Sequence, residues 1–123
     1  MSRQIFFLVC ALTLLSAQYI VNAEEGRAKA ESFATFWAGF KSAVAKNDKE
    51  AVVAATHLPS FKLSKAAFLK NYQALFTREV KKCFASAKPV RDRDTYSVFC
   101  GEEYYFFEKV NGAYKLTDIG MND

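Results

Sequence analysis

The stretch CGEEYYFFEKVNGAYKL, residues 100–116, decides the fold, because it places four aromatic residues in a row between two turn signals. Both residues of Asn111-Gly112 tolerate the positive φ of a type I′ turn, which predicts a hairpin between strands over 103–110 and 113–119. Gly101-Glu102 fits a type II′ turn with glycine first, and it joins the first of these strands to one over 95–100. This part of the chain is therefore predicted to be an antiparallel meander.

A fourth strand is predicted over residues 81–88, KKCFASAK. When a short loop connects it to the strand over 95–100, Cys83 falls opposite Cys100. Two cysteines in an exported chain are usually bridged, and opposite positions on neighbouring strands bring the sulfur atoms within reach. We expect a Cys83–Cys100 disulfide, with two buried thiols as the alternative.

The aromatic strand has two apolar faces. Alternate side chains of a strand point to opposite sides, so Tyr105 and Phe107 are predicted to face the helices, with Asp118 directly across from Tyr105. The opposite face is too apolar for an ordinary solvated surface, and such patches commonly mark partners. The predicted partner face consists of Phe84, Phe99, Tyr104, Phe106 and Ile119.

The preceding half of the chain is predicted to be helical. Apolar residues recur at spacings of three and four from Phe33 to Val44, which predicts an amphipathic helix over about 28–46. Asp48 is a good N-cap for a short second helix, KEAVVAATH, and Pro59 is expected to end it.

A third helix is predicted after Ser64, a good N-cap, with an apolar stripe that runs from Phe68 to Val80. The predicted fold class is α+β: three N-terminal helices packed on a curved four-stranded antiparallel meander.

The first 23 residues have the pattern of a cleaved signal peptide. Arg3 precedes an apolar run, and small or aliphatic residues lead up to Ala23. The run is shorter than the roughly 20 residues of a membrane-spanning helix, so we expect cleavage after Ala23, with an uncleaved anchor as the alternative. Residues 24–123 are then expected to form a single domain of a secreted or periplasmic protein.

The charge pattern argues against several classes of site. The net charge of +4 falls to +3 when Arg3 is removed, and acidic residues are interspersed among the basic ones, which indicates a solvated surface and no nucleic-acid partner. The sequence contains no glycine-rich phosphate loop and no nucleophile elbow. A zinc site needs four ligands, and only His57 is available to join the two cysteines, so no metal or cofactor is expected.

The helices that carry SFATFWAGF and FLKNYQALF, followed by a meander ending in YYFFEKVNGAYKLTDIG, resemble the nuclear transport factor two-like superfamily, in a small exported branch. That superfamily includes ketosteroid isomerase and polyketide-cyclase-like proteins. The resemblance implies a cone, in which the sheet wraps the long helix and leaves a cavity, and an outer sheet face that often forms dimers. Since members are enzymes, ligand binders or interaction modules, the resemblance leaves the function open.

Two sites follow from this resemblance. Family isomerases use an acidic base and a tyrosine in the oxyanion hole, and Tyr105 and Asp118 are the candidates for a catalytic pair; an ordinary cross-strand hydrogen bond is the alternative. Aromatic residues at helical spacing either line a cavity for an apolar ligand or fill the core. The candidate pocket residues are Trp37, Phe40, Phe68, Tyr72, Tyr105 and Phe107.

We expect an exported, non-enzymatic binding or interaction module that engages a small apolar ligand or a protein partner. A homodimer through the outer sheet face is one form of that partnership. The alternatives are a small-molecule isomerase-like or cyclase-like enzyme and an inhibitor-type or immunity-type protein. No stable membrane insertion is expected after signal cleavage.

Overall fold

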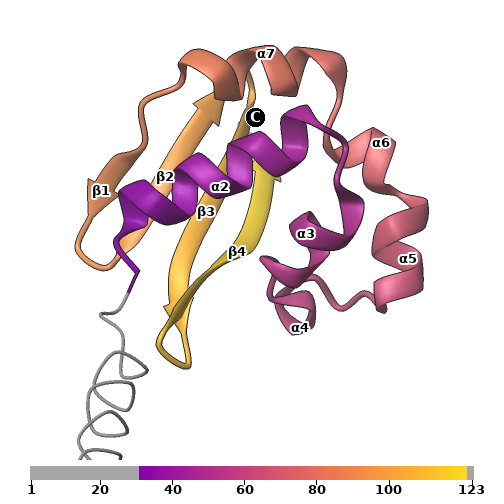
Figure 1. The fold of residues 1–123 in the computed structure, drawn as a ribbon, viewed down its shortest axis with the longest axis horizontal. Helices are drawn as coiled ribbons and strands as arrows, with labels where there is room; N and C mark the ends of the chain where they lie inside the picture. Colours follow the sequence, from indigo (N-terminus) through magenta and orange to yellow (C-terminus); the bar gives the residue numbers. More distant parts are fainter. Residues whose placement is uncertain (1–30, 122–123) are drawn as a thin grey trace, which may run out of the picture. The chain divides into compact units, whose positions relative to one another are not determined.

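The computed structural model describes residues 31–121, in which six helices are followed by four strands (Figure 1). The expected signal peptide, residues 1–23, and the first residues of the expected first helix, 28–30, lie outside the described residues. The elements are α2 (Phe33–Ala45), α3 (Lys49–Ala54), α4 (Leu58–Phe61), α5 (Lys65–Lys70), α6 (Tyr72–Leu75), α7 (Arg78–Ser86), β1 (Val90–Asp92), β2 (Thr95–Cys100), β3 (Glu103–Val110) and β4 (Ala113–Met121).

Helix α2 is the amphipathic helix that the sequence predicts. The Ser32 hydroxyl accepts a hydrogen bond from the Thr35 N–H at 3.2 Å, and this cap places the first helical residue at Phe33. Asn47 follows the helix with a φ of 56°, in the left-handed region that often ends helices. The buried stripe comprises Phe33, Phe36, Trp37, Phe40 and Val44.

The second helix is shorter than predicted. Asp48 caps α3 as expected, accepting from the Ala51 N–H at 3.2 Å. The helix ends at Ala54 because the next residues join the sheet edge: Thr56 bridges to Leu116, and the His57 N–H donates to the Leu116 carbonyl at 2.9 Å. Pro59 therefore does not end this helix. It lies in the first turn of α4, where its missing N–H costs no hydrogen bond.

The predicted third helix is divided into α5, α6 and α7. Ser64 caps α5, as the sequence predicts, by accepting from the Ala67 N–H at 3.1 Å. The chain then turns at Asn71, and Thr77 caps α7 by accepting from the Val80 N–H at 3.3 Å. The expectation of three N-terminal helices is thus wrong for the described chain, because Asn71 and Thr77 interrupt the continuous apolar stripe.

Residues 81–88 are not a strand, since α7 covers most of them. Val80 and Phe84 lie one helical turn apart and are both buried. Glu79 lies in the first turn, where its negative charge interacts favourably with the positive end of the helix dipole. Burial at helical spacing therefore outweighs the alternation of Cys83 with its neighbours, which is the pattern of a strand. Phe84 consequently lies in the core at 1% exposure, and its assignment to the partner face is wrong.

The sheet is an open antiparallel meander in the order β1-β2-β3-β4. Its first strand, β1, lies where the sequence predicted a loop, and a two-residue turn at Arg93-Asp94 connects it to β2. The two predicted hairpin turns are confirmed in their backbone requirements. Asn111 and Gly112 have φ values of 53° and 85°, and the first residue of the other turn, Gly101, has a φ of 64°.

A β-bulge changes the predicted register of the last hairpin. Phe106 pairs with Asp118 whereas Phe107 pairs with Leu116, so the intervening residue of β4 has no partner on β3. As a result, Ile119 lies opposite Tyr105 and packs against the core. The predictions that Asp118 lies across from Tyr105 and that Ile119 belongs to the partner face are both wrong.

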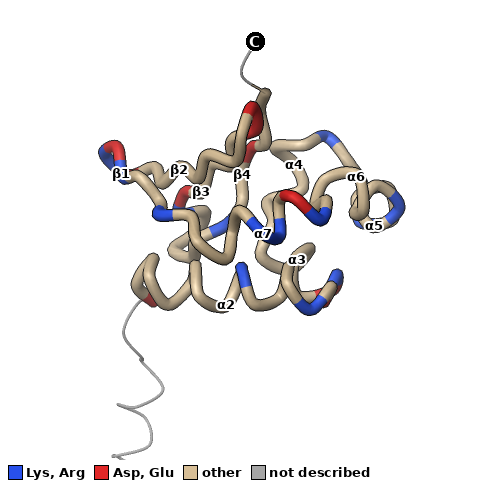
Figure 2. The backbone as a smooth tube through the Cα atoms, turned by 90° about the horizontal axis from the view of Figure 1, so that it is seen from above, with Lys and Arg blue, Asp and Glu red and all other residues tan. Residues whose placement is uncertain are grey.

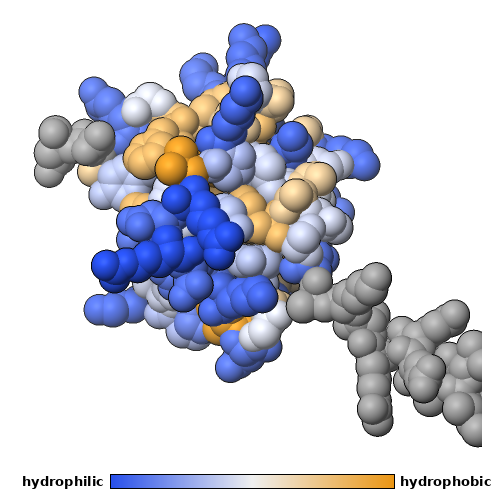
Figure 3. All heavy atoms as spheres, turned by 90° about the vertical axis from the view of Figure 1, so that its left-hand side faces the viewer, coloured by the Kyte–Doolittle hydropathy of each residue, from blue (hydrophilic) through white to orange (hydrophobic). Residues whose placement is uncertain are grey.

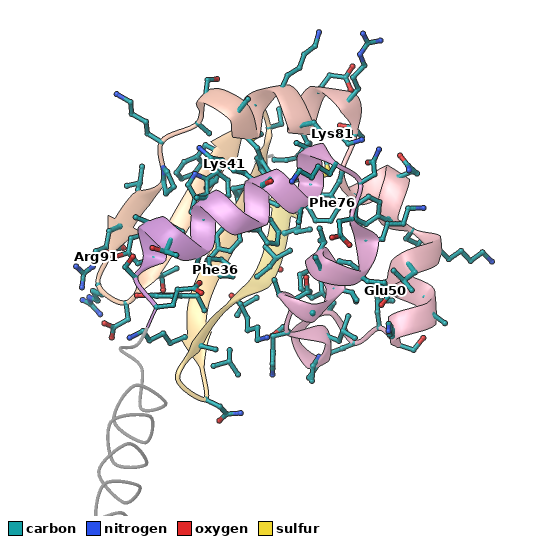
Figure 4. All side chains as sticks on the ribbon, in the orientation of Figure 1. Phe36, Lys41, Glu50, Phe76, Lys81 and Arg91 are labelled. Atoms are coloured by element: carbon teal, nitrogen blue, oxygen red, sulfur yellow. A yellow bond between two sulfur atoms is a disulfide. The ribbon has the colours of Figure 1, made fainter. Side chains whose placement is uncertain are left out.

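Helix α2 crosses one face of the sheet, with α7 next to it (Figure 1). The view from above shows α2 and the sheet as two layers, with no described element beyond the other sheet face (Figure 2). Phe36 and Phe76 point into the space between these layers (Figure 4). Rings from both layers meet there, as in the contact of Phe40 with Phe107 at a centroid distance of 5.2 Å. At the β1 edge, the Arg91 guanidinium lies 5.8 Å from the centre of the Tyr96 ring.

Candidate functional site: the outer face of the sheet

The sheet face turned away from the helices, called the outer face below, carries a group of aromatic and aliphatic side chains. The β pairing places Ser97 between Val90 and Phe106, and Tyr104 between Phe99 and Gly120. The Tyr104 ring lies 5.0 Å from the Phe106 ring and 6.4 Å from the Phe99 ring, measured between centroids. The outer aromatic patch is defined as Val90, Phe99, Tyr104 and Phe106.

The outer aromatic patch is open to solvent as far as residues 31–121 are concerned. Phe99 is 55% exposed and Val90 is 53% exposed. Large hydrophobic side chains with more than half of their surface exposed are costly, since full burial of one contributes about 1.5–3 kcal/mol. Only Met121, among the described residues, joins them in this class. Such a concentration on one face is typical of a contact surface.

Gly120 supports the patch through its missing side chain. A Cβ at this position would overlap the Tyr104 ring and its hydroxyl oxygen, so only glycine lets the ring lie flat over β4. Ring contacts with Phe99 and Phe106 hold Tyr104 from the other side. Tyr104 is therefore held in place by its neighbours within the chain, and preorganised side chains of this kind lower the entropic cost of any association.

Carboxylates border this patch. The outer positions of the four strands include Asp92, Glu108 and Asp118, all exposed. Glu108 is oriented by the Thr95 hydroxyl, which donates to its Oε1 at 3.1 Å. Lys115 carries the single amino group on these strand positions. It donates a hydrogen bond to the Ala54 carbonyl at 2.6 Å, at the C-terminus of α3.

The free edge of the sheet at β1 is a poorer candidate for contact. The strand has only three residues, Val90–Asp92, and Pro89 before it lacks an N–H. Short, charged edge strands resist pairing with other strands. Viewed from this edge, the surface is mostly hydrophilic, with hydrophobic residues in separate groups (Figure 3). Contact through the face is therefore favoured over strand addition.

Tyr105 and Asp118 do not form the expected catalytic pair. They lie on opposite faces of the sheet, because Asp118 pairs with Phe106. The Tyr105 hydroxyl instead donates to Glu103 Oε2 at 2.9 Å and lies 3.1 Å from the Leu75 carbonyl oxygen. Burial and the Glu103 carboxylate raise the pKa of Tyr105 far above its ordinary value. This hydroxyl stays protonated and links β3 to α6.

The candidate pocket residues Trp37, Phe40, Phe68, Tyr72, Tyr105 and Phe107 are all buried. Their rings contact other core rings: Trp37 lies 5.1 Å from Phe84, and Tyr72 lies 5.0 Å from Phe76, between centroids. These distances are those of close-packed aromatic pairs. The Tyr72 hydroxyl has no hydrogen-bond partner in the described chain, and burial, with a smaller effect of Asp48, raises the pKa of Tyr72.

A shallow groove that the sequence did not reveal runs along α2. Its volume is about 460 Å³, and Trp37 is the one candidate pocket residue that lines it. Ala34 and Ala38, one turn apart, leave space for the groove, and Lys41 stands beside them. The spacing of these two alanines on the exposed side of the helix was the available signal. The remaining lining residues are Ser32, Phe33, Pro89 and Tyr96.

The Cys83–Cys100 disulfide is present, with the two Cα atoms 5.7 Å apart. The pairing is confirmed, but the elements are different from those expected, since the bond joins helix α7 to the end of β2. It fixes α7 at the end of the sheet that carries Phe99 and the Gly101-Glu102 turn.

Two further features concern the remaining polar residues of the described chain. His57 Nδ1 lies 2.7 Å from the Ser60 hydroxyl in the first turn of α4, a local contact. No cluster of three or more His, Cys, Asp or Glu side chains suited to a metal ion occurs in this part of the chain. Nor does it contain a helix with the length and apolar character needed to cross a membrane.

Comparison with known proteins identified no relative: no family model, no curated protein and no solved structure matches this chain.

Proposed function

We propose that this protein is an exported, non-enzymatic interaction module that binds another protein through its outer aromatic patch. The observation that carries the proposal is the exposure of Phe99, 55%, next to two further aromatic rings on a sheet face that no described element covers. Burying this patch against a partner removes the cost of its exposure. Export is supported by the disulfide, because such bonds persist in oxidising compartments.

An inhibitor-type or immunity-type protein is one form of this proposal, since both act by covering a surface of another protein. The resemblance to the nuclear transport factor two-like superfamily remains part of the proposal at the level of element order, helices before a four-stranded antiparallel meander. The cone-shaped cavity implied by that resemblance receives less support, because the rings expected to line it pack against one another.

Small-ligand binding in the groove along α2 is the second candidate function. The groove's volume of about 460 Å³ falls within the range of ligand sites, and its aromatic residues suit an apolar ligand. The enzyme alternative is weaker, because Tyr105 and Asp118 lie on opposite faces of the sheet.

Substitutions on the patch test the proposal. Phe99→Ser and Phe106→Ser should keep the folded state but abolish co-purification of a stoichiometric partner from the native compartment. Met121→Ser is the matched control, because Met121 is 65% exposed but belongs to the other sheet face. Loss of the partner with Met121→Ser alone, or retention in both phenylalanine variants, would contradict the proposal. If both phenylalanine variants keep the partner but Ala38→Trp, which fills the groove, loses it, the ligand-binding alternative would be favoured.

A further inference from the structure

The charges around the outer aromatic patch determine what kind of partner it suits. Asp92 and Glu108 lie beyond one end of the patch along the strands, and Glu102 lies in the turn beyond the other end. Asp118 borders Phe106 on the β4 side. The patch is thus an apolar centre with carboxylates on three sides.

We propose that the outer aromatic patch selects a partner surface that carries lysine or arginine around an apolar centre, in preference to a second copy of this chain. The inference rests on the proposed function and specifies its partner. When the apolar centre of such a partner stacks on the patch, the lysine or arginine side chains around it lie next to the carboxylates of this chain. Charge complementarity of this kind steers association and excludes wrong partners.

Self-association is disfavoured by the same arrangement. A twofold dimer places the same surface on both sides of the interface. When two patches stack with their strands in the same direction, Asp92 and Glu108 of one copy approach the same residues of the other. In the reversed direction they approach Glu102. Like charges meet in both arrangements, and this juxtaposition opposes a homodimer.

The net positive charge of the chain does not reverse this preference. At physiological ionic strength, charges on separate surfaces are screened beyond about 8 Å. The lysines and arginines of α7 and α5 lie on the helical side of the sheet (Figure 2). Nearer the patch, Lys115 lies opposite Glu108, and Arg93 follows Asp92 in the turn between β1 and β2. The four carboxylates Asp92, Glu102, Glu108 and Asp118 outnumber these two basic side chains, so the outer face carries a local excess of negative charge. The negative charge of the outer face therefore determines which partner surface binds, and the net charge of the whole chain does not.

The test uses a displayed library of a small helical domain, with one surface randomised among Lys, Glu, Phe and Ser. Binders to the wild-type chain are selected and counter-selected against Phe99→Ser. We expect the recovered binders to be rich in Lys and Phe and poor in Glu. Repeating the selection with Asp92→Asn/Glu108→Gln/Asp118→Asn should remove the Lys enrichment and keep the Phe enrichment.

A second triple variant provides the charge-matched control. Glu31→Gln/Glu50→Gln/Glu79→Gln neutralises three exposed carboxylates of the helical segment and should leave the Lys enrichment intact. For one selected binder, the outer-face variant should lower the association rate constant on the order of tenfold at low salt, and the control should not.

The possible outcomes separate this inference from the function on which it rests. Binders that depend on Phe99 but show no Lys enrichment would overturn the inference and leave the interaction function intact. A Phe99-dependent homodimer in light scattering would also overturn it. The absence of any Phe99-dependent binder would count against the proposed function, and the inference would fall with it.

Discussion

The ring of Tyr104 occupies the space that a side chain at position 120 would need, so Tyr104 and Gly120 form a complementary cross-strand pair. Gly120→Ala should therefore push the ring off β4 and destabilise the protein by about 1–3 kcal/mol, the usual cost of overpacking. Urea unfolding measures this change. Gly39→Ala is the control: nothing lies within 4 Å of the added methyl group, and alanine in an exposed helix should stabilise by about 0.5–1 kcal/mol. Equal effects of both substitutions would contradict the close approach.

A negative charge should destabilise the protein far more at one of two adjacent positions of β3 than at the other. Phe107 is fully buried against Trp37 and Phe40, so Phe107→Glu should cost at least about 3 kcal/mol and prevent folding. Phe106 lies on the outer face, and Phe106→Glu should cost only about 1 kcal/mol. Circular dichroism and urea unfolding distinguish the two variants. Comparable loss of stability in both would show that the faces are assigned incorrectly.

The disulfide should contribute substantially to stability. It links residues 17 positions apart, and a closed loop of this length stabilises by about 3 kcal/mol in the chain-entropy description. Cys83→Ala/Cys100→Ala should lose that amount in urea unfolding, and added reductant should then have no further effect. Intact-mass analysis after alkylation should find no free thiol in the oxidised mature protein. Two alkylated cysteines would rule out the bond.

Stability should fall at alkaline pH, partly because of Tyr105. The pKa of Tyr105 is raised above its ordinary value of 10.0 in the folded protein, by burial first and then by Glu103. Above pH 10 the unfolded chain releases this proton more readily than the folded chain, so the free energy of unfolding decreases. Tyr105→Phe should be less stable near neutral pH but should lose less stability above pH 10. Tyr72→Phe should change the alkaline slope in the same direction. An unchanged slope in both variants would contradict the burial of these hydroxyl groups.

The sequence predicted the hairpins because glycine and asparagine at Asn111-Gly112 and Gly101 impose local backbone conformations that tertiary structure did not change. It predicted the Cys83–Cys100 bond but assigned Cys83 to a strand. Thr77, an N-cap residue, is the sequence signal for helix α7, but the alternation of Cys83 with the neighbouring alanines fits a strand as well.

Other errors had no local signal. The bulge between Phe106 and Phe107 places Asp118 on the outer face and turns Ile119 toward the core. The structure does place Phe99, Tyr104 and Phe106 on one sheet face, as the alternation of side chains along a strand predicts, because that alternation is a local property. The positions of Asp92 and Asp118 at the border of the outer aromatic patch were not predicted, since they depend on β1 and on this bulge.

Photo-crosslinking from position 99 tests the central claim most directly. A photoreactive amino acid in place of Phe99 should form one discrete covalent adduct with another protein in the native compartment, and the same group in place of Glu50, on the helical side, should form none. The adduct should disappear when Phe106→Ser is added. No adduct from position 99, or adducts of equal yield from both positions, would contradict the account that the outer face of the sheet is the binding surface.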